Sequence, residues 1–215
     1  MSQFLKNGIN TVVFTHLDLF FAMKDLVIAT RSTLVLWVLT ALIYPLLILL
    51  FGQALFPYQA NGSLVTNAAG EVVGSALIGQ TFTEPDYFWS RPSAINYSQG
   101  EQAIPTGQSG ASNLAPSNPE LRDRIDAEVQ RLGEEDVEKL TAEMLYSSGS
   151  GLDPHISPDM AFSQIPRIAQ ARQISPDQLT RLVNDAIAGP FLGIFGEPTV
   201  NVLSLNLALD ENANR

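Results

Sequence analysis

The sequence predicts a single-pass membrane protein that has one N-terminal transmembrane helix followed by a mixed α+β extracytoplasmic domain. Residues 33–56 contain no charged side chain. As a helix they would measure about 36 Å, enough to cross a hydrocarbon core of about 30 Å. Residues 57–215 are long enough for one domain with its own core, and they contain both strand-like and capped helix-like segments.

Basic residues on either side of the apolar run predict its orientation. Lys6, Lys24 and Arg31 precede the run, whereas the next basic residue after it is Arg91. Flanks rich in Lys and Arg stay in the cytoplasm. We therefore expect three parts in this order: a cytoplasmic tail over residues 1–31, a transmembrane helix over 32–56 and a periplasmic α+β domain over 57–215.

A cleaved signal peptide is the rival interpretation of the apolar run. The apolar core of a signal peptide normally has about 7–15 residues, fewer than this run contains. The pattern Gly52-Gln53-Ala54 is only a weak match to a cleavage site of the small-x-small type. We therefore interpret the run as a permanent anchor.

Composition excludes several classes of partner and site. The formal net charge is −10, whereas a protein that binds nucleic acid presents a basic surface. The chain contains no cysteine, which excludes disulfides and thiolate metal sites. The acidic charge favours solubility, although an acidic domain could also concentrate cations.

The tail and the span carry further patterns. Apolar residues near helical spacing indicate that the tail is either an amphipathic helix on the inner membrane face or a disordered lead-in. A proline in the middle of the span removes one backbone hydrogen bond and should kink the helix. Small and polar residues mediate helix packing in lipid. The candidate helix-packing positions are Thr40, Tyr44, Pro45, Gly52 and Gln53.

The predicted outer domain begins and ends with strands. Residues 63–66 and 72–78 alternate in the manner of strands around a turn at 67–70, which predicts a hairpin. Residues 81–118 are rich in Gly, Pro, Ser and Asn and predict a long loop, which indicates a binding surface or an ordered irregular region. Residues 199–209 include an alternating apolar stretch and predict a last strand.

Three helices are predicted between these strands, each beginning with a capping residue followed by proline. The first begins at Asn118-Pro119 and should end before Gly133. The second begins at Ser157-Pro158 and runs towards Gln173, with Pro166 predicting a kink or two pieces. The third begins at Ser175-Pro176 and should end at Gly189.

Signals for catalysis are weak. Residues 107–111 approach the G-x-S-x-G/A pattern of a hydrolase, with Ser109 as the nucleophile, but that motif needs a strand before it and a helix after it. The only histidine in the predicted outer domain that could act as its base is His155. Asp153 and His155 supply two metal ligands, too few for a zinc site. We predict no catalytic residue, no cofactor-binding residue and no metal ligand.

A glycine-rich stretch before the second helix is the candidate functional loop. Residues 147–151 resemble a phosphate-binding loop only in their glycines, because the motif's lysine is missing. Glycines here can adopt φ > 0, and the proline fixes φ ahead of the helix cap. We therefore predict a rigid structural or docking loop made of Gly149, Ser150, Gly151, Leu152, Asp153, Pro154 and His155.

Six stretches of the sequence together match one known family pattern in order: residues 59–64, 74–80 with Phe82, 87–94, 109–119, 148–158 and 195–210. They resemble the C subunit of the bacterial potassium-transporting Kdp ATPase, the KdpC family. The first twenty or so residues extend beyond the usual start of that family, and Tyr146-Ser147 stands where the family pattern has Thr-Ala. These departures concern the role of the tail.

The resemblance implies an accessory, non-catalytic subunit of a high-affinity, ATP-driven potassium uptake complex in the bacterial inner membrane. It implies three partners: a potassium-channel-like subunit, a P-type ATPase subunit and a small single-helix subunit. It also implies a catalytic chaperone that raises the ATP affinity of the ATPase subunit, with ATP and potassium handled by the complex. Two other classes stay open, a membrane-anchored periplasmic hydrolase and a periplasmic binding module.

Overall fold

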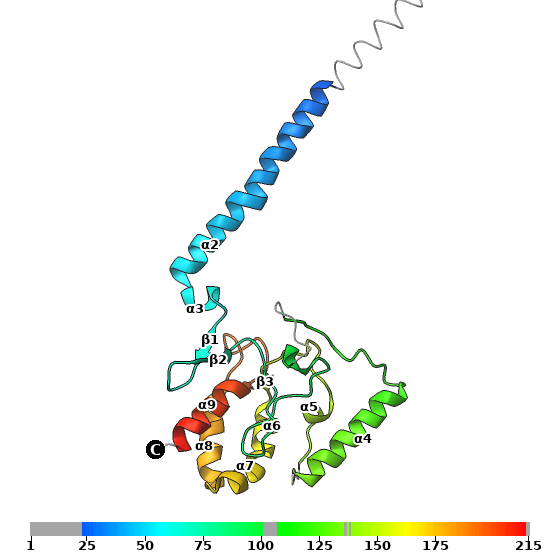
Figure 1. Cartoon of the computed structure of the whole chain (residues 1–215), viewed down its shortest axis with the longest axis vertical. Helices are drawn as coiled ribbons and strands as arrows, with labels where there is room; N and C mark the ends of the chain where they lie inside the picture. Colours follow the sequence, from blue (N-terminus) through cyan, green and yellow to red (C-terminus); the bar gives the residue numbers. More distant parts are fainter. Residues whose placement is uncertain (1–22, 101–106, 136, 138, 214–215) are drawn as a thin grey trace, which may run out of the picture. The chain divides into compact units, whose positions relative to one another are not determined.

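The computed structural model describes residues 23–100, 107–135, 137 and 139–213. The chain divides into two compact units, Met1–Asn61 and Gly62–Arg215, which we call unit 1 and unit 2. Figure 1 shows the elements of each unit, coloured along the sequence.

Unit 1 consists mainly of one long apolar helix. It runs from Met23 to Leu55 and is the only helix among the described residues that is long and apolar enough to cross a membrane. The predicted span of residues 32–56 lies almost wholly in this helix, which begins at least nine residues earlier than expected. Residues 1–22 of the predicted tail, and with them the expected amphipathic helix, lie outside the described residues.

The long helix changes its hydrogen-bonding pattern near Pro45. A π-helical turn, η1, covers Leu39–Ile43 and is followed by α2 over Tyr44–Leu55. Pro45 has no N–H with which to continue the α-helical ladder, and such interruptions are commonly accommodated by a π turn. A short helix, α3, covers Pro57–Ala60.

Unit 2 contains two small antiparallel sheets. The first is a hairpin of β1, Leu64–Thr66, and β2, Val72–Ser75, which confirms the predicted hairpin although its second strand ends before Ile78. The second sheet has the strand order β3-β5-β4. Its strands are β3 at His155–Ile156, β5 at Thr199–Asn201 and β4 at Ile187–Ala188.

Six α-helices among the described residues of unit 2 complete the architecture. The second predicted helix is divided at Gln164, next to Pro166, which confirms two pieces. Figure 1 shows α6 to α9 grouped together, with α4 at the edge of the unit. The helices are α4 at Pro119–Glu134, α5 at Ala142–Leu145, α6 at Pro158–Ser163, α7 at Ile165–Arg172, α8 at Pro176–Ala186 and α9 at Val202–Ala213.

Helix starts agree with the sequence better than helix ends do. The side chains of Asn118, Ser157 and Ser175 each accept a hydrogen bond from a backbone N–H of the first turn, which confirms the three predicted caps. Two of the three expected ends are wrong, because Gly133 lies inside α4 and α8 stops at Ala186, where the chain enters β4. The second predicted helix ends at Arg172, next to Gln173 as expected.

The predicted C-terminal strand is wrong for most of its length. Only Thr199–Asn201 is a strand, and the chain is helical from Val202 onward. Leucines at every second position gave the alternating pattern of a strand. The most deeply buried side chains, however, are Val202, Leu205 and Leu209, which recur at helical spacing.

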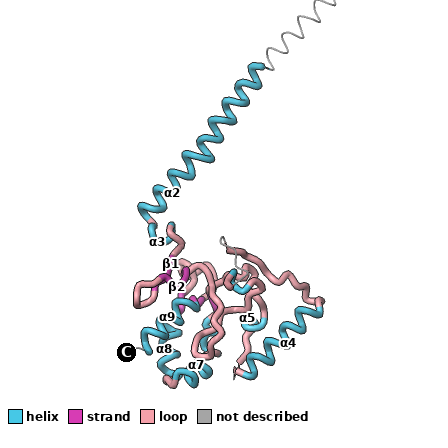
Figure 2. Tube along the Cα trace, viewed as in Figure 1, coloured by secondary structure: helices cyan, strands magenta, loops and turns pink. Residues whose placement is uncertain are grey.

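The core of unit 2 draws on α4 to α9, on β3 and β5 and on loop segments. Phe88 and Trp89, which belong to neither helix nor strand, are buried in the same cluster as residues from α7, α8 and α9. Figure 2 shows the long loop, in pink, that carries this pair between β2 and α4. The predicted loop over residues 81–118 contains only one short 3₁₀ turn, η2, at Asn96–Ser98 among its described residues.

Candidate functional site

The candidate loop, Gly149–His155, is held by hydrogen bonds to its backbone carbonyls. The Ser150 carbonyl accepts from the N–H of Gly110 at 2.8 Å and from the hydroxyl of Ser109 at 3.0 Å. The Leu152 carbonyl accepts from the N–H of Gly79 at 2.8 Å. Each of these bonds joins the loop to a segment at least 40 residues away in sequence, so the loop connects parts of the irregular region that lack a shared sheet or helix.

The two glycines of the candidate loop differ in their roles. Gly151 has φ +68°, and a Cβ placed on it would lie 2.5 Å from the Gly110 carbonyl oxygen and 2.6 Å from Cγ1 of Ile95. The predicted need for glycine is therefore confirmed at Gly151. The same prediction is wrong for Gly149, which does not have a positive φ and whose added Cβ would meet nothing within 4 Å.

A left-handed turn packs beside the candidate loop. Asn96, Tyr97 and Ser98 have φ between 48° and 55°, a region that residues other than glycine seldom occupy. The hydroxyl of Ser93 accepts from the Tyr97 N–H at 3.0 Å and donates to the Gly151 carbonyl at 2.8 Å, so one side chain ties the turn to the loop.

The Tyr97 side chain is buried and completes this contact. Its hydroxyl donates to the Arg91 carbonyl at 2.7 Å. Burial raises the pKa of the Tyr97 hydroxyl from 10.0 to about 12 because the charged phenolate would lose its hydration. A Cβ on Gly79 would lie 2.4 Å from the Tyr97 ring, so this glycine allows the ring to pack against the backbone.

Asp153 is engaged in structural contacts. Its carboxylate accepts from the His155 N–H at 3.0 Å and lies 3.3 Å from the Arg91 guanidinium. The His155 ring nitrogen Nδ1 is 3.5 Å from the same carboxylate. In the described ranges, no group of three or more His, Cys, Asp or Glu side chains is placed to hold a metal ion. Pro154 presents its carbonyl to the Val202 N–H at 3.0 Å.

The Ser109 side chain also forms a hydrogen bond with the backbone. Its hydroxyl donates to the Ser150 carbonyl, and no hydrogen bond joins it to His155 in the part of the chain that the structure describes. Residues 107–115 contain no helix, so the helix that a nucleophile elbow needs after its serine is missing there, and the residues where its strand would lie, 101–106, are outside the described residues. The Ser109 hydroxyl instead holds the candidate loop in place.

The candidate helix-packing residues do not form one stripe. Tyr44 and Gln53 are nine residues apart, which at about 100° per residue places them on opposite sides of α2. The Thr40 hydroxyl donates to the Leu36 carbonyl of its own helix at 2.8 Å. The Gln53 amide pairs with the Asn61 side chain at 3.1 Å, across the turn into α3.

The remaining two candidates also have local roles. A Cβ on Gly52 would lie 3.8 Å from the Ala60 side chain, an ordinary contact distance, so this glycine is not needed for the turn. Pro45 is the second residue after the π turn. Tyr44 is 63% exposed, and its side chain is the largest polar one among the five candidates. It is therefore the candidate best able to contact a partner helix.

Two buried amides that sequence reasoning missed fix the Phe88–Trp89 segment. Asn206 of α9 accepts from the Phe88 N–H at 2.8 Å and donates to the Phe88 carbonyl at 3.0 Å. Gln164 does the same for Trp89, at 2.7 Å and 3.2 Å. These side chains thereby replace the neighbouring strand that would otherwise satisfy the backbone of a buried loop. The sequence signal of Asn206 is a polar residue on an otherwise apolar helix face, whereas Gln164 lies in the turn between α6 and α7 and has no such signal.

Arginines surround the same segment. The guanidinium of Arg167 lies 3.5 Å from the centroid of the Trp89 ring and donates to the carbonyls of Pro85 and Tyr87. Arg131 approaches the Trp89 ring at 4.7 Å. Burial is the main cause that lowers the pKa of Arg167, to about 10. The Arg167 guanidinium stays charged because the Trp89 ring and the two backbone carbonyls replace part of its hydration.

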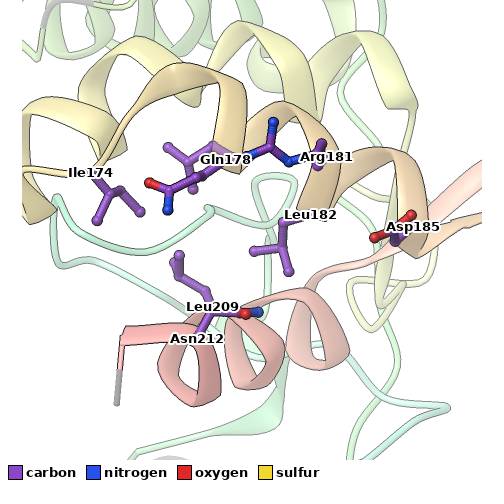
Figure 3. A pocket seen from close by; sticks show the side chains of 8 residues that line it. Ile174, Gln178, Arg181, Leu182, Asp185, Leu209 and Asn212 are labelled. Atoms are coloured by element: carbon purple, nitrogen blue, oxygen red, sulfur yellow. The ribbon is translucent and has the colours of Figure 1, made fainter. Parts of the chain in front are cut away.

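Among the hollows on the described part of unit 2, two have the largest volumes of those compared. Figure 3 shows one of about 310 Å³ between α8 and α9, lined by Leu182 and Leu209 with polar side chains such as Gln178 and Asp185. The other, of about 490 Å³, adjoins Trp89 and Arg131. Neither is lined by the candidate loop.

Comparison with known proteins gives one consistent result. The family model described as KdpC, K⁺-transporting ATPase, c chain, matches residues 26–211. A potassium-transporting ATPase KdpC subunit of Synechocystis sp. (strain ATCC 27184 / PCC 6803 / Kazusa) is 66% identical over 187 residues, covering 87% of this chain and 98% of that protein. The KdpC subunit of Anabaena sp. (strain L31) is 57% identical, with 87% of this chain and 93% of that protein covered. The KdpC subunit 2 of Nostoc sp. (strain PCC 7120 / SAG 25.82 / UTEX 2576) is 55% identical, with 89% and 96% covered.

Proposed function

This chain belongs to the KdpC family, the c chain of the potassium-transporting Kdp ATPase, and we propose that it acts there as a non-catalytic assembly subunit and catalytic chaperone. The observation that carries the proposal is the family match, which extends from the long helix of unit 1 to α9 of unit 2. The expected partners are the potassium-channel-like subunit, the P-type ATPase subunit and a small single-helix subunit.

The described site supports a structural role. The carbonyls of Ser150, Gly151, Leu152 and Pro154 all accept hydrogen bonds from distant segments of unit 2. A loop whose polar groups are committed in this way shapes a surface without moving protons or binding phosphate. We therefore assign the candidate loop to the stability of unit 2 and of the face that docks on partner subunits.

The orientation in the membrane is part of the proposal. Lys24 and Arg31 lie in or before the first turns of the long helix, and no basic residue follows it until Arg91. This asymmetry favours a cytoplasmic N-terminus and a periplasmic unit 2 in the bacterial inner membrane. A reporter that is active only in the periplasm should be active after Arg215, and activity of a cytoplasm-only reporter there would contradict the orientation.

The chaperone role requires coupling across the membrane. ATP binds on the cytoplasmic side, whereas unit 2 is proposed to lie outside. A change in ATP affinity must then pass through the long helix or the partner subunits, as a linked equilibrium between two sites. The complex lacking this chain should therefore show a raised KM for ATP, and an unchanged KM would overturn the chaperone role.

The test of the assembly role replaces residues 33–56 with a Leu/Ala helix of equal length and the same flanking charges. Lipid provides no hydrophobic drive for helix association, so association depends on small and polar positions. Co-purification with the other Kdp subunits should fall sharply, while unit 2 keeps the thermal unfolding of the native chain. A matched control restores only Thr40, Tyr44, Pro45, Gly52 and Gln53. If the plain helix assembles and supports pumping normally, the helix is only an anchor.

A further inference from the structure

The segment between β4 and β5 forms an exposed apolar loop, Pro190–Gly196. Its four large side chains are between 63% and 77% exposed. No charged residue stands between Asp185 and Glu197, so the loop and its flanks are neutral. An exposed cluster of this kind normally marks a contact with another apolar surface. The four side chains belong to Phe191, Leu192, Ile194 and Phe195.

The loop satisfies much of its own backbone. Phe191 and Phe195 exchange two hydrogen bonds, with N···O distances of 2.8 Å and 3.0 Å. The N–H of Gly193 donates to the Pro190 carbonyl at 2.9 Å, and that of Ile194 donates to the Phe191 carbonyl at 3.2 Å. A segment that enters an apolar phase must pair its backbone groups internally. This turn carries four N–H groups that would stay paired on leaving water.

The loop also has a defined shape. Leu192 has φ +54° and Gly193 has φ +73°, so the tip is a tight turn with a leucine in the left-handed region. That conformation is unfavourable for leucine and persists where surrounding structure imposes it. The turn therefore presents Leu192 and Ile194 on either side of Gly193 at its exposed tip. An exposed apolar tip of this kind fits insertion into lipid better than contact with a flat protein surface.

Chain connectivity keeps unit 2 near the membrane. The long helix ends at Leu55 and unit 2 begins at Gly62. The six residues between them reach at most about 20 Å even when fully extended, and those of α3 reach less. With the helix inserted, Gly62, the first residue of unit 2, therefore stays at the end of this short tether, within about 20 Å of the end of the helix.

A second exposed apolar segment lies between the tether and the loop. The β1–β2 hairpin exposes Leu64, Val72 and Leu77, which are between 49% and 60% exposed. Its continuation is joined to β5, because the Asn201 side chain donates to the Ala76 carbonyl at 2.9 Å. The hairpin that follows the tether and the strand that follows the apolar loop are thus neighbours, and both bear apolar surface.

We propose that the apolar loop inserts into a lipid leaflet and gives unit 2 a membrane contact in addition to the span. The contact requires neither anionic lipid nor low salt, because the loop carries no cation. The proposal rests on insertion of the long helix and does not depend on the chaperone role. In this proposal the apolar loop contacts lipid. Burial of the loop by a partner subunit is a separate outcome of the test.

The absence of cysteine from the native sequence makes a single-site probe straightforward. The full chain carrying Leu192→Cys is labelled with an environment-sensitive fluorophore and placed in phosphatidylcholine nanodiscs, with or without a lipid that bears a quencher on its acyl chain. The control is Asp126→Cys on the exposed face of α4. Quenching at position 192 should exceed quenching at 126 several-fold and should persist at high salt.

A second variant separates insertion from misfolding. Adding Ile194→Asp to the labelled Leu192→Cys chain should lower quenching to the level of the control, with thermal unfolding unchanged because the side chain is exposed. Equal quenching at positions 192 and 126 in the chain alone would overturn the proposal. It would also be overturned if quenching at 192 vanished in the assembled Kdp complex, since a protein partner would then cover the loop.

Discussion

Replacing Gly151 with alanine tests whether the candidate loop holds the irregular half of unit 2 together. The added methyl group would lie 2.5 Å from the Gly110 carbonyl oxygen and 2.6 Å from Cγ1 of Ile95. One of these neighbours is backbone, which cannot rotate away as the end of a flexible side chain could. The substitution therefore has to displace the loop or the segment that carries Gly110.

The expected loss of stability can be assembled from three effects. An alanine in the left-handed region costs about 1–2 kcal/mol. Forcing an extra methyl group into a packed site costs about 1–3 kcal/mol. Disturbing the bond between the Gly110 N–H and the Ser150 carbonyl, 2.8 Å long, removes about 1 kcal/mol. The effects overlap, so we expect a total of about 3–5 kcal/mol, a large part of the 5–15 kcal/mol that is typical of a domain.

The assay is thermal and urea unfolding of the full chain in detergent, followed by co-purification with the other Kdp subunits. For a domain of this size the loss corresponds to a Tm lower by about 6–20 °C, with an unchanged dependence on urea. Gly149→Ala is the matched control, because its Cβ meets nothing within 4 Å. Equal stability of the two variants would refute the assignment of the loop as a structural tie.

Three further predictions test the surrounding contacts. Gln164→Met leaves the buried N–H and carbonyl of Trp89 unpaired, so it should lower the free energy of unfolding in a urea titration by about 2–4 kcal/mol. The control Gln170→Met, on the exposed side of α7, should change this free energy by less than about 0.5 kcal/mol. Tyr97 has its pKa raised from 10.0 to about 12, so the native state holds a proton that the unfolded chain has lost; stability should fall as pH rises between these values, and Tyr97→Phe should flatten that fall in alkaline unfolding curves. Ser109→Ala removes one hydrogen bond to a carbonyl, so the assembled complex should keep its potassium-stimulated ATPase activity, and a large loss of kcat with intact assembly would show a catalytic role.

Local signals in the sequence were sufficient for the helix starts. The Ser175 hydroxyl accepts from the Gln178 N–H, and the Ser175 N–H donates to the Gln178 side-chain oxygen, so the whole capping box lies within four residues. The proline that follows each cap adds a second signal at the same place. Helix ends were less predictable, because α8 ends where Ile187 joins β5 as part of a sheet, and Ile187 pairs there with Val200, which lies outside any local sequence pattern.

The C-terminal segment shows how one sequence can satisfy two periodicities. Leucines at 203, 205, 207 and 209 predict a strand, while Val202, Leu205 and Leu209 fit a helix. The choice between strand and helix depends on Asn206. In the helical form its side-chain amide forms hydrogen bonds with the Phe88 backbone. That partner lies 118 residues earlier in the sequence, so no local window contains the information.

The same long-range ties bear on how the subunit meets its partners. Phe88 and Trp89 lack a neighbouring strand, yet Asn206 and Gln164 satisfy both their N–H and carbonyl groups. An irregular segment held in this way is ordered before any partner binds, so assembly does not have to supply the entropy of ordering it. A variant of an internal tie such as Gln164 should therefore lose stability and assembly together, because it disorders the segment. A change confined to an exposed side chain should reduce assembly alone, and this separation distinguishes a preformed docking face from one that folds on contact.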